Sequence, residues 1–211
     1  MIPIGSFPAL GGPFLRGRWP ALFAAAALGL AACSLPGPPP AQYVLDPVPA
    51  ATATTVSQTA LPIVEVGRVQ LPDYLDTTDI LERRGNQLVP SETGRWGERL
   101  SIGMTHALVI SLASRLPGMM VTGTTPAGRP ALQVLVDVGA FESRPEGQVV
   151  LVARWVVADG VSRRTIAAQQ TSLVDAVAGS GDSAVVAAMS HLVEELAGQL
   201  AAGLQRDLRS G

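Results

Sequence analysis

Regularly spaced hydrophobic positions run from about residue 61 to residue 206 and predict alternating strands and helices. Leu132, Val134, Val136 and Val138 alternate with more polar residues, as in a strand with one buried face. The strand pattern also occurs at residues 43–46, 63–69, 79–84, 87–90, 119–122, 148–158 and 163–174. Gly85-Asn86 separates two of these runs and predicts a tight hairpin.

Two longer segments have the spacing of amphipathic helices. The first spans residues 97–116 and ends at Pro117-Gly118; the second begins at Asp182 or Ser183 and continues to about Arg206. Their apolar stripes consist of Leu100, Met104, Ala107, Leu108 and Leu112, and of Val185, Met189, Leu192, Leu196, Leu200 and Leu204. We therefore expect an α+β domain in which two principal helices cover one face of a mainly antiparallel sheet.

The first 32 residues have the organisation of a lipoprotein signal peptide. Arg16 and Arg18 precede an apolar run at 19–32 that is shorter than a membrane span. The run ends in Leu30-Ala31-Ala32-Cys33, which resembles the bacterial lipobox, and Cys33 is the only cysteine of the chain. We predict that Cys33 becomes the acylated first residue of the mature protein. An ordinary signal peptide followed by a buried free cysteine, or an uncleaved anchor, is the alternative.

Residues 33–41 form the predicted tether. Ser34 to Ala41 reads SLPGPPPA, and such a proline-rich segment favours an extended, semi-rigid spacer. One folded domain is expected beyond it, at residues 42–208. In enterobacterial lipoproteins a residue such as Asp after the acylated cysteine retains the protein at the inner membrane. Ser34 therefore predicts sorting to the outer membrane.

The composition excludes several classes of function. The 15 basic residues, all arginine, are balanced by 17 acidic residues, and the net charge of −2 gives no electrostatic basis for binding nucleic acid. One cysteine and two histidines leave little material for a disulfide, a zinc site or an iron–sulfur cluster. The chain has no Gly-x-Ser-x-Gly elbow and no phosphate loop. We therefore expect no enzyme activity, no cofactor and no metal.

An acidic series at Asp73, Asp76, Asp79 and Glu82 raises the question of a cation site. Calcium loops, however, need alternating oxygen ligands and a glycine at the turn. Pro72 and Tyr74 favour a corner between strands with a packed ring.

Several motifs in one order resemble the PqiC-type lipoproteins, the auxiliary components of ABC transport. The lipobox is followed by Tyr43-Val44-Leu45-Asp46 and Ile63-Val64-Glu65-Val66, and then by the most distinctive motif, Leu71-Pro72-Asp73-Tyr74-Leu75-Asp76. Residues 80–83 and the pair Arg95-Trp96 also correspond, so the resemblance extends over residues 42–204. The chain departs from the family after Trp96, where Gly97, Glu98 and Arg99 replace Ala-Glu-Pro.

The resemblance implies a non-enzymatic role. Members of this family are partners of transporters with mammalian-cell-entry (MCE) domains, at the periplasmic face of the outer membrane. The expected function is docking of the MCE subunit that bridges the periplasm, in support of lipid movement between membranes. A lipid-binding carrier is the alternative, and an anchored envelope enzyme has no residue constellation to support it.

Tyr74, Arg95 and Trp96 are the candidate contacts for a protein partner, because aromatic residues and arginine are common at binding hot spots. For Trp96 the alternative is packing against the following helix, and for Tyr74 a structural packing role is the alternative as well. On strand 148–158, Val150, Val152 and Val156 make the second face apolar as well. We therefore predict self-association, in the form of a ring that can surround a rod-like partner. A sheet with helices on both sides is the alternative.

Overall fold

The computed structural model describes residues 37–46 and 61–208, with side chains as far as residue 206. The chain divides into two units at residue 38, and the folded domain described below belongs to the second unit, residues 39–211. The predicted signal peptide, Cys33 and residues 34–36 of the tether lie outside the described residues.

The elements follow the hydrophobic pattern closely. The hairpin at Gly85-Asn86, the two helices and the three long strands near the C-terminus are confirmed, and the glycine of the hairpin has a φ of 61°. The first helix begins at Leu100 instead of residue 97. In chain order the elements are β1 (Ala41–Tyr43), β2 (Ile63–Val66), β3 (Asp79–Arg84), β4 (Gln87–Trp96), α2 (Leu100–Arg115), β5 (Met120–Thr122), β6 (Leu132–Arg144), β7 (Gln148–Asp159), β8 (Thr165–Ala176) and α3 (Asp182–Leu208).

The sheet of eight strands is mixed, and the prediction of a mainly antiparallel sheet was wrong. Four of the seven strand pairings among the described residues are parallel: β1–β4, β2–β5, β2–β6 and β3–β6. The three antiparallel pairings, β3–β4, β6–β7 and β7–β8, all join strands that follow one another through short turns. Turn residues reveal such neighbours in a sequence, whereas the parallel pairs join strands that are distant in the chain.

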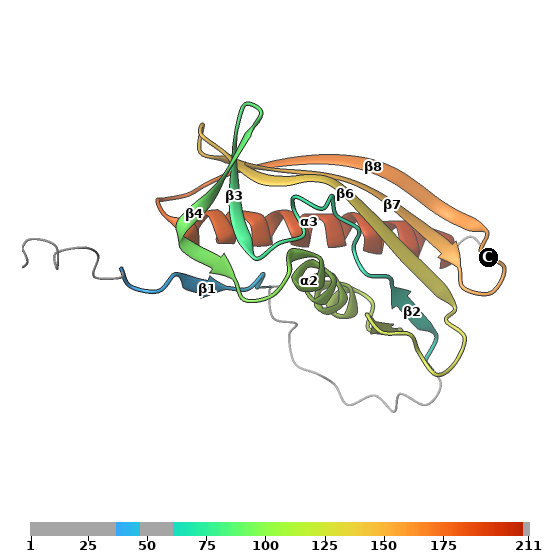
Figure 1. Cartoon of the computed structure of the whole chain (residues 1–211). Helices are drawn as coiled ribbons and strands as arrows, with labels where there is room; N and C mark the ends of the chain where they lie inside the picture. Colours follow the sequence, from blue (N-terminus) through green and yellow to red (C-terminus); the bar gives the residue numbers. More distant parts are fainter. Residues whose placement is uncertain (1–36, 47–60, 209–211) are drawn as a thin grey trace, which may run out of the picture. The chain divides into compact units, whose positions relative to one another are not determined.

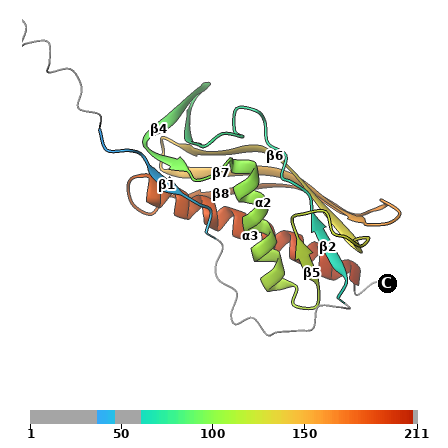
Figure 2. The ribbon, with the colours of Figure 1, turned by 60° about the horizontal axis from the view of Figure 1, so that its bottom comes forward.

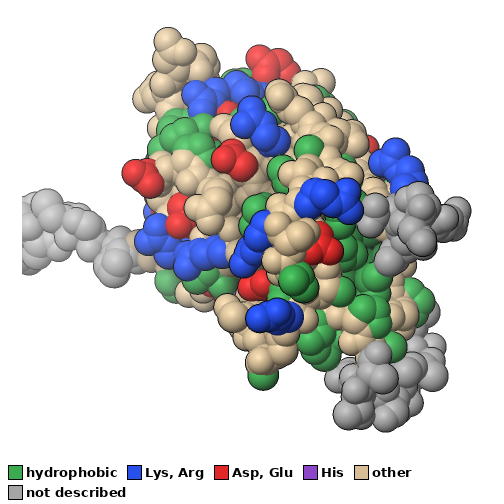
Figure 3. Space-filling model, turned by 90° about the vertical axis from the view of Figure 1, so that its right-hand side faces the viewer, with side chains coloured by type: hydrophobic (Ala, Val, Ile, Leu, Met, Phe, Trp, Pro, Cys, Tyr) green, Lys and Arg blue, Asp and Glu red, His purple; other side chains and the backbone are tan. Residues whose placement is uncertain are grey.

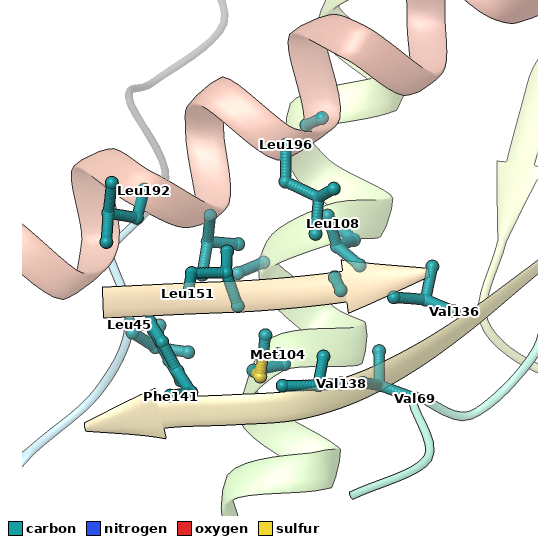
Figure 4. Packing of buried hydrophobic residues seen from close by; sticks show 14 of the residues in the cluster. Leu45, Val69, Met104, Leu108, Val136, Val138, Phe141, Leu151, Leu192 and Leu196 are labelled. Atoms are coloured by element: carbon teal, nitrogen blue, oxygen red, sulfur yellow. The ribbon is translucent and has the colours of Figure 1, made fainter. Parts of the chain in front are cut away.

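Both helices lie on one face of the sheet, as predicted (Figures 1 and 2). The alternating residues of β6 and β7 that the pattern assigns to this face are buried, including Val134, Val149 and Leu151 with no exposed surface. Met104 and Leu108 of α2 lie in the same cluster as Val138 and Phe141 of β6 and Leu196 of α3 (Figure 4). The domain therefore has one hydrophobic core between the sheet and the two helices. Among the described residues, no helix combines the length and the hydrophobicity that crossing a membrane requires.

The opposite face of the sheet, which we call the outer face, has no helix over it in the described part of the chain. Leu135 of β6 is 46% exposed and Val174 of β8 is 55% exposed. Val150, Val152 and Val156 of β7 are only partly buried. Asp137 and Arg154 lie opposite each other on neighbouring strands of the same face and are exposed. The outer face is thus partly apolar, and no helix of the described residues covers it.

Gly203, near the C-terminal end of α3, packs so closely on Trp155 that no larger side chain fits there. A Cβ atom added to Gly203 would lie 2.9 Å from Cη2 of Trp155, which is closer than real carbon atoms approach. A Cβ atom added to Gly198, five residues earlier, would make only an ordinary van der Waals contact, with Nε of Arg115 at 4.0 Å. Gly203 and Gly198 therefore provide a test position and a control position for alanine substitution within one helix.

We expect opposite effects of alanine at these two glycines. Gly203→Ala should lower the free energy of unfolding by about 1–3 kcal/mol, because the rigid indole has to move within the core. Gly198→Ala should raise it by up to about 1 kcal/mol through helix propensity. Urea unfolding of both variants measures the difference, and equal effects would show that Trp155 does not limit the approach of α3.

Candidate partner-binding surface

The motif at residues 71–76 forms a turn that divides its side chains between the core and the surface. The N–H groups of Leu75 and Asp76 both donate to the carbonyl of Pro72, at 2.9 and 3.2 Å. Leu75 is buried in the core, while Asp73 and Tyr74 face solvent. The turn that Pro72 and Tyr74 predicted is present, but the Tyr74 ring lies at the surface and not in the core.

Asp76 connects this turn to the start of α2. Its Oδ1 accepts a hydrogen bond of 3.1 Å from the N–H of Ser101, in the first turn of the helix. Its Oδ2 lies 2.9 Å from the guanidinium of Arg99 and 3.8 Å from that of Arg68. Arg99 occupies the N-cap position but makes no capping bond with its own side chain. Asp76 therefore caps α2 from a distant part of the chain.

The environment of Asp76 favours its ionised form. Burial by itself raises the pKa of this carboxyl, but hydrogen bonds from Arg99 and Ser101 outweigh burial and hold the pKa below its usual range. The positive end of the α2 dipole acts in the same direction. At neutral pH the cap is thus a carboxylate.

Tyr74 belongs to a second polar cluster, on the outer face. The Arg83 guanidinium donates to the Tyr74 hydroxyl over 3.0 Å, and its carbon lies 5.5 Å from the centre of the tyrosine ring. The same guanidinium donates to Oε1 of Glu142 over 2.5 Å, and Arg144 lies 3.3 Å from that oxygen. This hydrogen bond to Glu142 raises the pKa of Arg83 above its ordinary value. The hydroxyl of Tyr74 also donates to the carbonyl of Gly139, over 3.4 Å.

Glu142 is the buried member of this cluster. Its side chain has no exposed surface, and its Oε2 has no hydrogen-bond partner among the described residues. Removing a charge partner from a buried carboxylate is costly, so Arg83 cannot leave Glu142 freely. The cluster therefore holds the Tyr74 ring in one orientation at the surface.

Arg95 and Trp96 lie at the end of β4, beside the same turn. The Arg95 guanidinium lies 3.1 Å from a carboxylate oxygen of Asp79. The N–H of Trp96 donates to the carbonyl of Thr78, over 2.8 Å. The indole of Trp96 is only 4% exposed and packs in the core, as the packing alternative predicts. Of the three candidate contacts, Tyr74 and Arg95 reach the surface in this structure.

The polar contacts around the turn at residues 71–79 form three clusters, Asp76 with Arg68 and Arg99, Tyr74 with Arg83, and Asp79 with Arg95, which together make up a candidate surface. We call it the motif surface and define it by Arg68, Tyr74, Asp76, Arg83, Arg95 and Arg99. Sequence reasoning named Tyr74, Arg95 and Trp96 as candidate contacts and did not name Arg68, Arg83, Arg99 or Glu142, which the structure places in these clusters. No sequence signal separated Glu142 from Asp137, the other acidic residue of β6. Arg99 stands where the chain departs from the family pattern, and this residue makes the bond to Asp76.

The acidic series that suggested a cation pairs instead with arginine. Asp76 contacts Arg99, Asp79 contacts Arg95, and Glu82 contacts Arg84. Within the described ranges, no group of three or more His, Cys, Asp or Glu side chains is arranged to hold a metal ion. Acidic and basic side chains are also interspersed on the end of the domain that Figure 3 shows, without a patch of one sign.

The two histidines lie on the surfaces of the two helices. Nδ1 of His106 is 3.1 Å from Glu98, and Nδ1 of His191 is 2.8 Å from Asp175. Each imidazole is largely exposed. Both are therefore surface histidines.

The family model for the ABC-type transport auxiliary lipoprotein component matches residues 43–201, which is most of the chain. The chain belongs to this family. It is therefore a PqiC-like auxiliary lipoprotein component of an ABC-type transport system, from a family with no known catalysis. No curated protein sequence matches the chain.

Solved structures share the fold of this auxiliary lipoprotein at low sequence identity. The crystal structure of an uncharacterised protein is 20% identical with a TM-score of 0.66, and the match covers 77% of this chain and 97% of that one. A DUF330 protein from Xanthomonas campestris is 15% identical with a TM-score of 0.60, covering 80% and 99%. The PelC dodecamer from Paraburkholderia phytofirmans is more distant, with 8% identity, a TM-score of 0.40, and coverage of 69% and 95%.

The cap that Asp76 supplies can be tested by pH. Asp76→Asn should lower the free energy of unfolding by about 1–2 kcal/mol at pH 7, because the amide accepts weaker hydrogen bonds from Ser101 and Arg99. Because folding lowers the pKa of Asp76, its contribution is present above the unfolded pKa and is lost as the pH falls through the folded one. The difference between wild type and variant should therefore shrink below about pH 4. Urea unfolding at several pH values measures it.

Asp73→Asn is the control, since Asp73 is exposed in the same turn. It should change stability by less than about 0.5 kcal/mol at every pH. The pKa of Asp159 is lowered too, by hydrogen bonds from Ser162 and Val161, but this group is present in all three proteins and cancels in the comparison. A difference that does not depend on pH would contradict the assignment of Asp76 as an ionised cap.

Proposed function

We propose that this auxiliary lipoprotein is anchored in the outer membrane, faces the periplasm, and docks the MCE-type subunit of its transport system. The observation that carries the proposal is the motif surface, in which the most distinctive motif, residues 71–76, presents Tyr74 to solvent beside Arg83 and places Asp76 beside Arg68 and Arg99. The role is to hold and align a partner, since a tethered docking domain requires no chemistry of its own.

The motif surface has properties that favour docking. Tyr74 is 36% exposed and is held by Arg83 and the Gly139 carbonyl, so little conformational entropy is lost when a partner covers it. The Arg68 and Arg99 side chains are more than half exposed although both approach Asp76. Aromatic and arginine side chains of this kind are frequent at hot spots.

Anchoring through Cys33 belongs to the same proposal. Acylation and cleavage at this residue would leave the domain on a proline-rich tether of eight residues, Ser34 to Ala41. At about 3.1 Å per residue such a tether reaches roughly 25 Å from the lipid surface. The domain could then meet a subunit that extends across the periplasm.

Self-association is also part of the proposal, and the open outer face supports it. Leu135, Val174 and the three valines of β7 leave apolar surface uncovered among the described residues. A second copy or the transport partner would bury this surface. A ring of copies remains the expected form. A sharp monomer mass across micromolar concentrations would exclude it.

A lipid carrier is the second candidate, because one groove has suitable lining. A groove of about 450 Å³ lies between α2 and β5, lined by Ile102, Val109, Ile110 and Val121 with Arg68 at its side. Such a groove could hold one acyl chain beside a cation. Phospholipid that co-purifies with the protein and is lost in an Ile110→Asn variant would favour this role over docking.

We expect Tyr74→Ser to weaken the complex with the MCE subunit by more than about tenfold, because a fixed aromatic contact is lost. Affinity can be measured by capture of the lipoprotein in detergent on the immobilised MCE subunit. Val161→Ser is the control, because Val161 is 63% exposed in the turn between β7 and β8. The control should leave the affinity unchanged.

Equal affinities for wild type and Tyr74→Ser would show that the motif surface does not contact the MCE subunit. Unfolding curves of both variants separate loss of contact from loss of fold. Trp96→Ala is not a useful probe here, because truncating a buried tryptophan costs about 3–5 kcal/mol of stability.

Cys33→Ser should release the protein from the membrane fraction, since no acyl chain can then be attached. Fractionation of envelopes with wild type and variant measures this release. Mass spectrometry of the wild-type N-terminus should show an acylated cysteine. A variant that stays in the membrane would favour the uncleaved anchor instead.

A further inference from the structure

Strand β8 is a long sheet edge without a neighbour. Its 12 residues, Thr165–Ala176, pair with β7 along one side, and no described strand pairs with the other side. Figure 1 shows β8 as the outermost strand along the long side of the sheet. A row of backbone N–H and C=O groups is therefore free to pair with another strand.

The sequence of β8 lacks the features that normally protect an edge. It contains no proline and no basic residue, and its only charge is Asp175, next to its end. Ten consecutive residues, Thr165 to Val174, are uncharged. Typical strands have about five or six residues, and exposed edges usually carry charges or proline.

The other edges of the sheet are protected. Strands β1 and β5 have only three residues each. Strand β4 pairs with β1 at Gly94 to Trp96 only, and its remaining part contains Pro90 and Glu92. The contrast singles out β8 among the described strands.

We propose that β8 pairs with β8 of a second copy of this chain, antiparallel and around a two-fold axis. The charges near the two ends of β8 favour an antiparallel second copy as the partner. Arg163 and Arg164 precede the strand, and Asp175 lies near its other end. Asp175 bonds to His191 and keeps 30% of its side chain exposed. An antiparallel copy places the arginines of each chain near the aspartate of the other, whereas a parallel copy places like charges together.

The symmetry places the middle of β8 opposite itself. A two-fold axis perpendicular to the sheet pairs residues of the same face, so Gln170 meets Gln170 of the other copy when Asp175 meets Thr165. Gln170 lies opposite Arg154 of β7 and is exposed on the outer face. Cα atoms of directly opposed residues in an antiparallel pair are about 4.5–5.5 Å apart.

This contact deepens the self-association proposed above and rests on it, but not on docking of the MCE subunit. A two-fold contact closes with two copies, so a ring would need a second contact. The outer face is available for that contact.

Disulfide trapping in the full-length lipoprotein tests the pairing. Gln170→Cys should form covalent dimers in oxidised membranes, because opposed residues at this spacing match disulfide geometry. The control is Gln87→Cys, at an exposed position of the β3–β4 hairpin. Wild type measures any background from Cys33, the only native cysteine.

A dimer yield at least about fivefold higher for Gln170→Cys than for Gln87→Cys and wild type supports the proposal. Equal yields indicate random collision and overturn it. If a general amine- or carboxyl-reactive cross-linker joins wild-type copies but Gln170→Cys gives no excess dimer, self-association holds and the β8 contact is excluded. If wild type shows no association at all, both fail, and docking is unaffected.

Charge substitution provides a second test that needs no cysteine. Gln170→Lys or Gln170→Glu alone should reduce recovery of a tagged copy with an untagged one by about tenfold, because like charges meet at the axis. Co-expression of the two variants should restore recovery, because opposite charges then meet. Gln87→Lys and Gln87→Glu should leave it unchanged. Failure of the mixed pair to recover would overturn the two-fold arrangement.

Discussion

Two apolar helix stripes are buried against a single face of one sheet, and the other features of the domain depend on this arrangement. Met104 and Leu108 of α2 share a cluster with Phe141 of β6 and Leu196 of α3. Because one core serves both helices, neither helix can move without exposing the surface of the other. The outer face and the β8 edge are left open as a consequence.

The position of α2 in turn fixes the motif surface. Its N-terminus lacks a local capping side chain, and Asp76 supplies the cap from a turn that precedes β3. The same carboxylate draws Arg99 and Arg68 together, while Arg83 and the buried Glu142 hold Tyr74. Ionic bonds between arginine and carboxylates thus organise this surface, which agrees with a chain whose basic residues are all arginine.

These contacts position side chains and provide no reacting group. Asp76, Asp79 and Glu82 face guanidinium groups, and the two histidines lie on exposed helix surfaces; among the described residues no group of side chains is arranged to hold a metal ion. Such an arrangement suits recognition by shape and charge. It is compatible with an auxiliary lipoprotein component of an ABC-type transport system.

The sequence by itself determined the elements and their buried faces. Alternation along β6 and β7 and the stripes of α2 and α3 are local consequences of strand and helix periods, so they could be read without a structure. The motifs also sufficed to identify the family. The order of strands was decided only in three dimensions, because parallel pairs such as β2–β6 join residues far apart in the chain. For the same reason the cap by Asp76, the burial of Glu142 and Trp96, and the free edge of β8 depend on tertiary contacts that no local pattern contains.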